Sequence, residues 1–296
     1  MSRNRCFLLI FAVLLLPVRT WAGTLNIGDI HADPMDAIKR STPLAKYLAK
    51  ELQSEGIDEG KVVVVRSIPE MGKLLREGKI DLFIDSPFPA LAVSRLADTK
   101  FLLRRWKKGL AEYRAVIFAL KDGGVARLED LNGKLIAFEE PTSTSTYFLP
   151  KLVMVQKGLK LVEKKGASDS VGPNEIGYVF VGSDPNTIFW VLRRRAAAGV
   201  ANQQNFSLEA RGHLDDLRRI HETFNIPRQI VSYRVDLNPK LLAKIKETLI
   251  KMDQSEEGRK ALRESDNTTK FDELPEGSMT PLLKSVKFIE SEFGIK

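Results

Sequence analysis

Cysteine is almost absent from this chain. Cys6 is the only one in 296 residues, and it lies in an apolar stretch, residues 6–18, near the N-terminus. If that stretch is removed on secretion, the mature protein has no thiol. Disulfides, thiolate metal sites and a cysteine nucleophile are then all excluded.

Motifs of common enzymes are missing as well. The sequence has no Gly-x-Ser-x-Gly elbow and no phosphate loop ending in Gly-Lys-Ser/Thr. His213 and His221 lie outside any expected strand end. Glu139 and Glu140 are neighbours, so in a strand their carboxylates point to opposite faces and cannot share a substrate. We therefore expect a protein that is not an enzyme and needs no cofactor.

Long apolar runs are confined to the N-terminus. Arg3 and Arg5 precede the apolar stretch, which is too short to span a bilayer, and Thr20-Trp21-Ala22 offers small residues at a cleavage point. Residues 1–22 are therefore predicted to be a cleaved signal peptide, the alternative being an uncleaved anchor. No Leu-x-x-Cys stands at the cleavage point, so we expect no lipid anchor and a mature chain of about 274 residues.

Positive charge exceeds negative charge only slightly. The formal net charge is +8, and it falls to about +5 when the three arginines of residues 1–22 leave. Such a balance attracts small anions. Without an aromatic-basic stripe we expect no nucleic-acid partner. The basic clusters at residues 104–108 and 193–195 are interpreted as solvated faces or edges, with docking contacts to a membrane partner as the alternative.

Strand-like and helix-like segments alternate along the chain, which predicts an α/β fold with mostly parallel sheets. The apolar run at residues 62–65 is typical of a strand buried on both faces. The expected strands are residues 25–30, 62–65, 81–85, 113–120, 135–138, 178–181 and 199–201. The expected helices begin at Thr42-Pro43, near Met71, at Ser86-Pro87 and after Thr146, and later ones cover residues 239–263 and 280–293.

Four residues with hydroxyl side chains lie between the strand expected at residues 135–138 and the helix expected to follow it. They are Ser143, Thr144, Ser145 and Thr146. The first N–H groups of a helix have no partner within it, and with the helix dipole and nearby hydroxyls they can hold phosphate-like oxygens. The alternative is an ordinary N-cap.

A wider window resembles a known family. The pieces Tyr113 to Ile117, Leu128 to Lys134, Ala137-Phe138, Pro141, Ser143-Thr144-Ser145 and Pro150 are similar to the signature of the phosphonate/phosphite/phosphate substrate-binding proteins of ABC transporters. Later pieces agree in order: Val181-Gly182-Ser183, Ile226-Pro227 and Asp236 to Pro239.

The resemblance implies a type II periplasmic binding protein with two lobes, each a mostly parallel sheet flanked by helices, and a cleft between them. The chain is expected to cross near Tyr113 and Ile226. Residues 23–112 and 226–296 would then form lobe 1, and residues 113–225 lobe 2. A bound ligand is expected to close the lobes by a hinge motion.

The resemblance also suggests ligand-binding residues in lobe 2. Ser143, Thr144 and Ser145 match the family, whereas Thr146 replaces a glycine. Ser183 matches and Asp184 stands where histidine is common, either as the N-cap of the helix beginning at Pro185 or as a group that shares a proton with the ligand. Asn202 and Asn205 occupy a strand end where the family can carry an acid, which argues against an ammonium-bearing ligand.

In lobe 1 the expected ligand contacts are Asp85 and Ser86, at the end of a strand, although Ser86 has the alternative role of capping the next helix. The family often has an aromatic residue near position 90, where this chain has Ala90 with Phe88 close by. His31, Asp33 and Asp36 could bind a metal, but their spacing is unspecific and loop polarity explains them. We expect no metal.

The sequence therefore predicts a periplasmic solute-binding protein that captures a small oxyanion for an ABC importer and partners a membrane permease. The alternative is a periplasmic sensory subunit for a membrane histidine kinase or cyclase. A monomer is expected in either case. A thermal-shift screen over oxyanions would show the ligand, since ligand at a hundred times its Kd stabilises a protein by about 2.7 kcal/mol.

Overall fold

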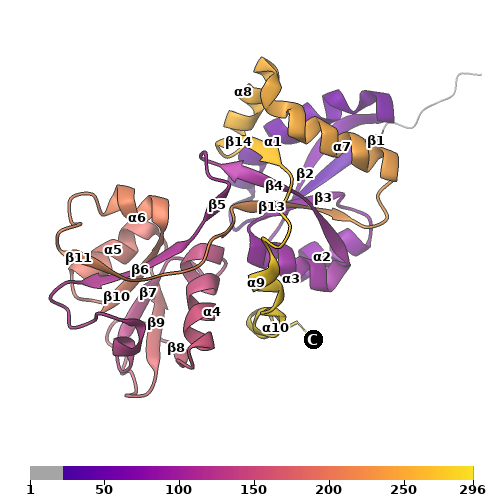
Figure 1. Cartoon of the computed structure of the whole chain (residues 1–296). Coiled ribbons are helices and arrows are strands. Elements are labelled where there is room, and N and C mark those ends of the chain that lie inside the picture. The colour runs from indigo at the N-terminus through magenta and orange to yellow at the C-terminus, as the bar shows by residue number, and fades with distance from the viewer. Residues whose placement is uncertain (1–22, 296) are drawn as a thin grey trace, which may run out of the picture.

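The computed structural model describes residues 23–295, so the expected signal peptide, residues 1–22, lies outside the described residues. Two six-stranded sheets, each flanked by helices, form two lobes (Figure 1). The lobe 1 sheet has the order β14 (Thr268–Asp272), β4 (Thr99–Lys107), β13 (Gln229–Arg234), β3 (Leu82–Asp85), β1 (Gly23–Ile30) and β2 (Ile57–Val65). The lobe 2 sheet has the order β11 (Leu217–Glu222), β6 (Ala115–Leu120), β10 (Ala198–Asn202), β7 (Leu135–Phe138), β9 (Ile176–Phe180) and β8 (Leu161–Glu163). The expected two-lobe α/β fold is confirmed.

The helices pack on both lobes. Lobe 1 has α1 (Pro34–Glu51), α2 (Ile68–Arg76), α3 (Pro87–Ala97), α7 (Pro239–Lys251), α8 (Glu256–Glu264), α9 (Thr280–Leu283) and α10 (Val286–Phe293). Lobe 2 has α4 (Leu149–Gln156), preceded without a break by the π-helical turn η3 (Thr144–Phe148), and α5 (Asp184–Leu192) and α6 (Gln203–Glu209). Short 3-10 turns are η1 (Gln53–Glu55), η2 (Leu128–Leu131) and η4 (Met252–Gln254).

In both sheets most strands run in one direction, as expected, but antiparallel strands are mixed in. In lobe 1, β13 runs antiparallel to β3 and β4, and in lobe 2, β6 runs antiparallel to β10 and β11. A parallel pair needs a crossover connection, usually a helix. β6 and β13 enter their sheets from the connections between lobes, without such a helix, and can therefore run against their neighbours.

The two connections between lobes pair with each other. β5 (Glu112–Tyr113) and β12 (Ile226–Pro227) form a small antiparallel sheet, with Ile226 opposite Tyr113. The two expected crossing points lie in these strands. The lobe boundaries at residues 112/113 and 225/226 themselves stay a prediction.

The expected helix start at Thr42-Pro43 is wrong. Helix α1 begins at Pro34, and Asp33 caps it by accepting hydrogen bonds from the N–H groups of Met35 (2.9 Å) and Asp36 (3.3 Å). Asp33-Pro34 gives the same capping signal nine positions earlier, and Pro43 lies inside the helix. The role of Asp33 is therefore explained by capping of the helix. No cluster of three or more side chains that could bind a metal occurs among residues 23–295.

The expectation that residues 62–65 are buried on both faces is also wrong. β2 is the outer strand of its sheet, so three of its four consecutive valines are only half-buried. Helix α1 lies so close to β2 that a Cβ on Gly60 would be 2.0 Å from the Ala45 carbonyl oxygen. Glycine is required there by the approach of the helix.

The two expected C-terminal helices are each interrupted. The first breaks between α7 and α8, where Ser255 caps α8 by accepting from the Gly258 N–H (3.0 Å). A Cβ on Gly258 would lie 1.9 Å from the Met252 carbonyl oxygen, so the tight turn needs glycine. The second breaks between α9 and α10 at Lys284 and Ser285.

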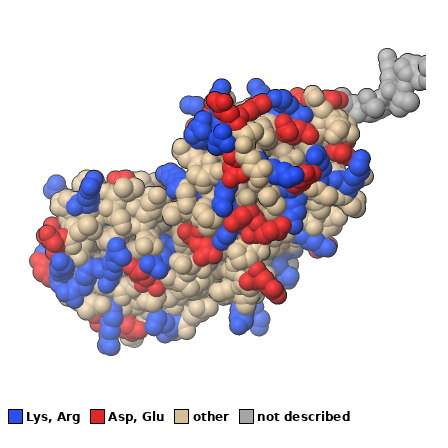
Figure 2. All heavy atoms as spheres, turned by 45° about the horizontal axis from the view of Figure 1, so that its top comes forward, with Lys and Arg blue, Asp and Glu red and all other residues tan. Residues whose placement is uncertain are grey.

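The basic cluster at residues 104–108 is not the solvated face that its composition suggests. Arg104 and Arg105 are 8% and 6% exposed, because β4 lies between β13 and β14 in the sheet. By contrast the cluster at residues 193–195 is exposed, as expected. Figure 2 shows Lys and Arg mixed with Asp and Glu over the face drawn. No helix within residues 23–295 has the length and apolarity needed to cross a membrane.

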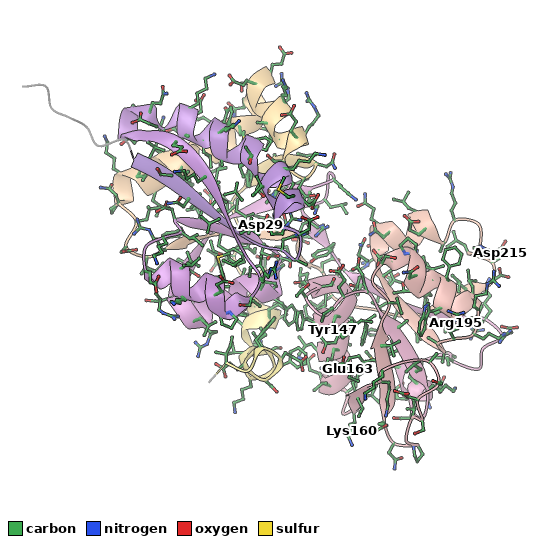
Figure 3. All side chains as sticks on the ribbon, turned by 180° about the vertical axis from the view of Figure 1, so that it is seen from behind. Asp29, Tyr147, Lys160, Glu163, Arg195 and Asp215 are labelled. Atoms are coloured by element: carbon green, nitrogen blue, oxygen red, sulfur yellow. The ribbon has the colours of Figure 1, made fainter. Side chains whose placement is uncertain are left out.

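The lobes touch through aromatic rings and one ion pair. Phe148 of lobe 2 stacks on Phe88 (centroids 5.3 Å apart) and packs on Phe293 of α10 (4.7 Å). Beside them the Lys151 ammonium and the Tyr147 hydroxyl both donate to the Glu292 carboxylate, at 2.7 and 3.0 Å. α10 therefore lies against α4 (Figure 1), with Tyr147 near the junction (Figure 3).

This contact predicts that Glu292→Gln weakens the closed arrangement. The Lys151 ammonium would lose its carboxylate, and both side chains are largely buried, with 12% and 14% exposure. We expect a loss of roughly 1–3 kcal/mol, the range for hydrogen bonds to charged groups. Thermal unfolding and small-angle scattering measure stability and lobe opening.

The matched control is Asp122→Asn, which removes an exposed ion pair with Arg194. It should change neither quantity appreciably. Equal effects of the two variants would contradict a special role for the Glu292 contact.

Candidate functional site

A chain of hydrogen bonds crosses between the lobes at the start of the helix η3–α4. The Phe88 N–H donates to the Thr144 hydroxyl (3.3 Å), which donates to the Ser86 hydroxyl (2.8 Å). Ser86 in turn donates to the Asp85 carboxylate (3.0 Å). The structure therefore brings together three of the residues expected to bind ligand. Ser86 makes no side-chain cap to α3, so its alternative capping role is not seen.

Two of the other hydroxyl groups at this helix start form hydrogen bonds within lobe 2. Ser143 is a true N-cap, accepting from the Thr146 N–H at 3.3 Å. Thr146 is fully buried, and its hydroxyl donates to Glu139 (2.7 Å), so it helps hold the turn. Ser145 lies close enough to Tyr113 to lower the pKa of that phenol. We refer to residues 143–146 as the cradle.

Asp184 is not the N-cap of α5. That role belongs to Ser183, whose hydroxyl accepts from the Asn186 N–H (3.3 Å), and the helix begins at Asp184 itself. Asp184 instead accepts through Oδ2 from the side-chain amides of Asn205 and Asn202 (3.3 Å for Asn202). The structure thus brings three expected site residues into one polar cluster.

The charge of Asp184 is poorly compensated. Its Oδ1 is buried and has no hydrogen-bond partner among residues 23–295. Burial, and next the nearby Glu139, raise the pKa of Asp184 to about 7, while the Asn205 hydrogen bond and Arg228 act in the opposite direction. Near neutral pH this carboxyl can hold a proton, which removes its repulsion of an anion.

Arg228 and Tyr113 at the connections between lobes were not expected as site residues. The Arg228 guanidinium lies 4.3 Å from the centre of the Tyr113 ring. No carboxylate of residues 23–295 lies within ion-pair distance of Arg228. Burial raises the pKa of Tyr113, and Arg228 and Ser145 lower it. A half-buried arginine without an ion pair, next to the cradle hydroxyls, suits an anionic ligand.

On the lobe 1 side a cavity of about 220 Å³ adjoins the hydrogen-bond chain. Asp85 lines it, and burial raises the pKa of Asp85 to about 6. Asp29 and Arg40 form an ion pair in its wall (2.7 Å), with Asp29 at the end of β1 (Figure 3). Ala90 is buried, and the neighbouring Phe88 provides the aromatic contact on this side.

Sequence reasoning missed several residues of the cleft for one reason. Arg40 lies in a helix, Arg105 in a strand that was not expected, and Arg228 just before β13, another unexpected strand. Only the long-range pairing of β13 with β3 and β4 places the last two beside Asp85. Glu139 was considered from the sequence, but only as a possible catalytic carboxylate and not as a neighbour of the ligand site.

Comparison with known proteins places the chain in a family. Residues 31–276 match the family of phosphonate periplasmic substrate-binding proteins of ABC transporters, and the chain belongs to this family. Its members are periplasmic and bind substrates for transporters; they are not enzymes. The chain is therefore a periplasmic substrate-binding protein of an ABC transporter, as the sequence indicated.

Solved structures agree on the fold. XAC2383 from Xanthomonas citri, bound to ATP, is 22% identical with a TM-score of 0.82, covering 91% of this chain and 98% of that one. PhnD1 from Prochlorococcus marinus, in complex with methylphosphonate, is 18% identical with a TM-score of 0.63, covering 92% and 99%. A binding component of an ABC phosphonate transporter from Pseudomonas aeruginosa is 17% identical with a TM-score of 0.60, covering 92% and 88%.

The raised pKa predicts how Asp184 affects stability. An unfolded aspartate titrates near pH 4, so between about pH 4 and about pH 7 the folded protein holds a proton that the unfolded chain has lost. The stabilisation is complete below pH 4 and is lost as pH rises through about 7. Asp184→Asn should reduce this decline and be more stable than the parent at pH 8 by roughly 2–4 kcal/mol.

Chemical denaturation at pH 5 and pH 8 measures the effect. Asp216→Asn, at an exposed carboxylate, is the control and should leave the decline unchanged. An Asp184→Asn protein whose stability falls as steeply as that of the parent would contradict the protonated carboxyl.

Proposed function

We propose that this protein captures a small oxyanion, namely a phosphonate, phosphite or phosphate, in the cleft between the lobes and delivers it to the permease of an ABC importer. The observation that carries the proposal is the meeting of hydroxyls from both lobes at one helix start, where Thr144 contacts Ser86. Arg228 supplies an unpaired positive charge nearby. The proposal includes removal of residues 1–22, crossing of the chain near residues 113 and 226, and a monomeric protein.

The chemistry of the cradle fits this role. Hydroxyl and N–H donors at a helix start hold oxyanions without adding many protein charges. When a ligand enters, Thr144 and Ser86 can turn their hydroxyl protons from each other towards its oxygens. Contacts from both lobes then exist only in the closed arrangement, so the ligand stabilises closure.

Asp184, Asn202 and Asn205 support the choice of ligand. A fully ionised dianion would meet the Asp184 carboxylate, whereas a protonated Asp184 can donate to an oxyanion. The amides next to it offer no charge to an ammonium group. The anions in the similar structures, methylphosphonate and ATP, belong in a first screen, together with inorganic phosphate and phosphite.

Ser143→Ala, Ser145→Ala and Arg228→Gln test the cradle. Each should weaken binding of the preferred oxyanion by roughly 1–3 kcal/mol, because a charged acceptor loses one donor. Titration calorimetry measures the affinity, and circular dichroism checks that the fold is kept.

Ser255→Ala is the matched control, because Ser255 caps α8 by the same kind of hydrogen bond. It should lose stability and keep its affinity. If the cradle variants behave like Ser255→Ala, residues 143–145 are simply a helix cap and the oxyanion proposal is wrong.

A further inference from the structure

The cavity beside the cradle is formed mainly by lobe 1. Its wall comes from β1, α1, β3, β4, the start of β13 and the turn after α8. Glu140 and Thr142 of lobe 2 close one side. Because both lobes contribute, the compartment is complete only when they are in contact. At about 30 Å³ of liquid per water, 220 Å³ holds about seven waters, enough for a short substituent but not for a second large ligand.

Three charged groups of this wall are already paired. Asp29 accepts from two nitrogens of Arg40, at 2.7 and 3.2 Å. Asp266, which also lines the cavity, pairs with Lys107. These ions have their counter-charges and need no ligand.

Arg105 is the cation of this wall that has no ion pair among the described residues. Its side chain is buried, with Nε donating to the Thr268 hydroxyl (2.7 Å) and Nη2 to the Ser265 carbonyl (2.6 Å). Both acceptors are neutral, and no carboxylate of residues 23–295 lies within ion-pair distance. Burial lowers its pKa to about 10, so it is still charged at neutral pH. The nearby Asp266 acts against this lowering, but no carboxylate is in direct contact, and a buried guanidinium without a contacting anion is costly unless something else provides one.

Two further polar groups of the cavity are unsatisfied. The Ser265 hydroxyl and Gln229 Oε1 are buried and have no partner among the described residues. Ser265 is 1% exposed, and both residues line the cavity. Buried polar atoms are nearly always hydrogen-bonded, so these two mark a place where a ligand group completes the bonding.

The register of the lobe 1 sheet indicates how far Asp85 and Arg105 lie from each other, and so how far a ligand substituent must extend. Ile230 pairs with Asp85, and the adjacent Gln229 pairs with Arg105, so Asp85 and Arg105 lie on either side of β13. Two strand spacings separate them by about 10 Å. Asp85 and Arg105 both line the cavity, so a substituent that runs from the Asp85 side to Arg105 has to cross it.

We propose that the cavity holds a substituent of the ligand whose oxyanion lies in the cradle, and that this substituent ends in a carboxylate bound by Arg105 and Ser265. The inference rests on the proposed function. Four carboxylates line the cavity, two of them paired with cations, and Arg40 is taken up by Asp29, so Arg105 is the cation of the described wall that is left to bind a negative group. The ligand class is a carboxyalkyl phosphonate.

A set of ligands matched in length tests the proposal. They are 3-phosphonopropionate, propylphosphonate and 2-aminoethylphosphonate, with methylphosphonate as the ligand that does not reach the cavity. We expect 3-phosphonopropionate to bind at least tenfold more tightly than propylphosphonate, equivalent to about 1.4 kcal/mol, and 2-aminoethylphosphonate to bind more weakly than either. Titration calorimetry gives the four dissociation constants.

Variants assign the gain to the cavity. Arg105→Met and Ser265→Ala should each lose most of the preference for 3-phosphonopropionate and keep the affinity for methylphosphonate. Ser265→Ala is the safer variant if Arg105→Met fails to fold. Ser232→Ala is the matched control, because Ser232 is also a buried serine with an unpaired hydroxyl but does not line the cavity.

The outcomes separate the two proposals. Equal affinity for propylphosphonate and 3-phosphonopropionate, or a preference for 2-aminoethylphosphonate, overturns the carboxylate subsite and leaves oxyanion capture standing. A preference that survives in Arg105→Met or Ser265→Ala also overturns it. If methylphosphonate and all the longer ligands fail to bind, the subsite proposal is wrong; if inorganic phosphate and phosphite fail to bind as well, the proposed function is wrong too.

Discussion

The Thr144 hydroxyl links the two lobes, and the arrangement of the cleft depends on it. It accepts from the Phe88 N–H of lobe 1 and donates to the Ser86 hydroxyl, which continues to Asp85. A hydroxyl has one proton, so the direction of this chain is fixed by the carboxylate at its end. The Thr144 hydroxyl, at the start of the lobe 2 helix, therefore has its hydrogen-bond partners in lobe 1 only while the lobes touch.

Charge around this contact is distributed unevenly. Asp29 and Asp272 have arginine partners in the folded protein, at 2.7 and 2.8 Å. Three other charged groups around the cleft have no ion pair among the described residues. They are Asp184, Arg105 and Arg228. Groups whose burial is poorly compensated cluster at functional sites, because a ligand can supply the missing interaction. In the proposed function, the two unpaired arginines favour an anion in the cleft even though the face drawn in Figure 2 mixes both signs.

Those parts of the candidate site that lie in local patterns could be proposed from the sequence. Residues 143–146 and 183 follow strands and open helices, and such signals can be read within a window of about ten residues. The same rule misled the assignment of the cap, because Ser183 and Asp184 both precede Pro185 and only the packed structure shows that the carboxylate turns towards Asn202 and Asn205.

What could not be predicted depends on strand pairing between distant segments. The burial of Arg105 follows from β4 lying between β13 and β14, and neither of those strands had been expected. The position of Arg228 follows from the return of the chain to lobe 1 at β12. No local propensity encodes these pairings, since register is set by which faces are buried in the assembled sheet.

The most direct test is a crystal structure of the protein with methylphosphonate. The account predicts that the phosphonate oxygens lie within hydrogen-bond distance of the hydroxyls of Ser143, Thr144 or Ser145 and of the Arg228 guanidinium, with Ser86 contacting the same group from lobe 1. A ligand bound elsewhere, with the Thr144 and Ser86 hydroxyls still bonded only to each other, would contradict it.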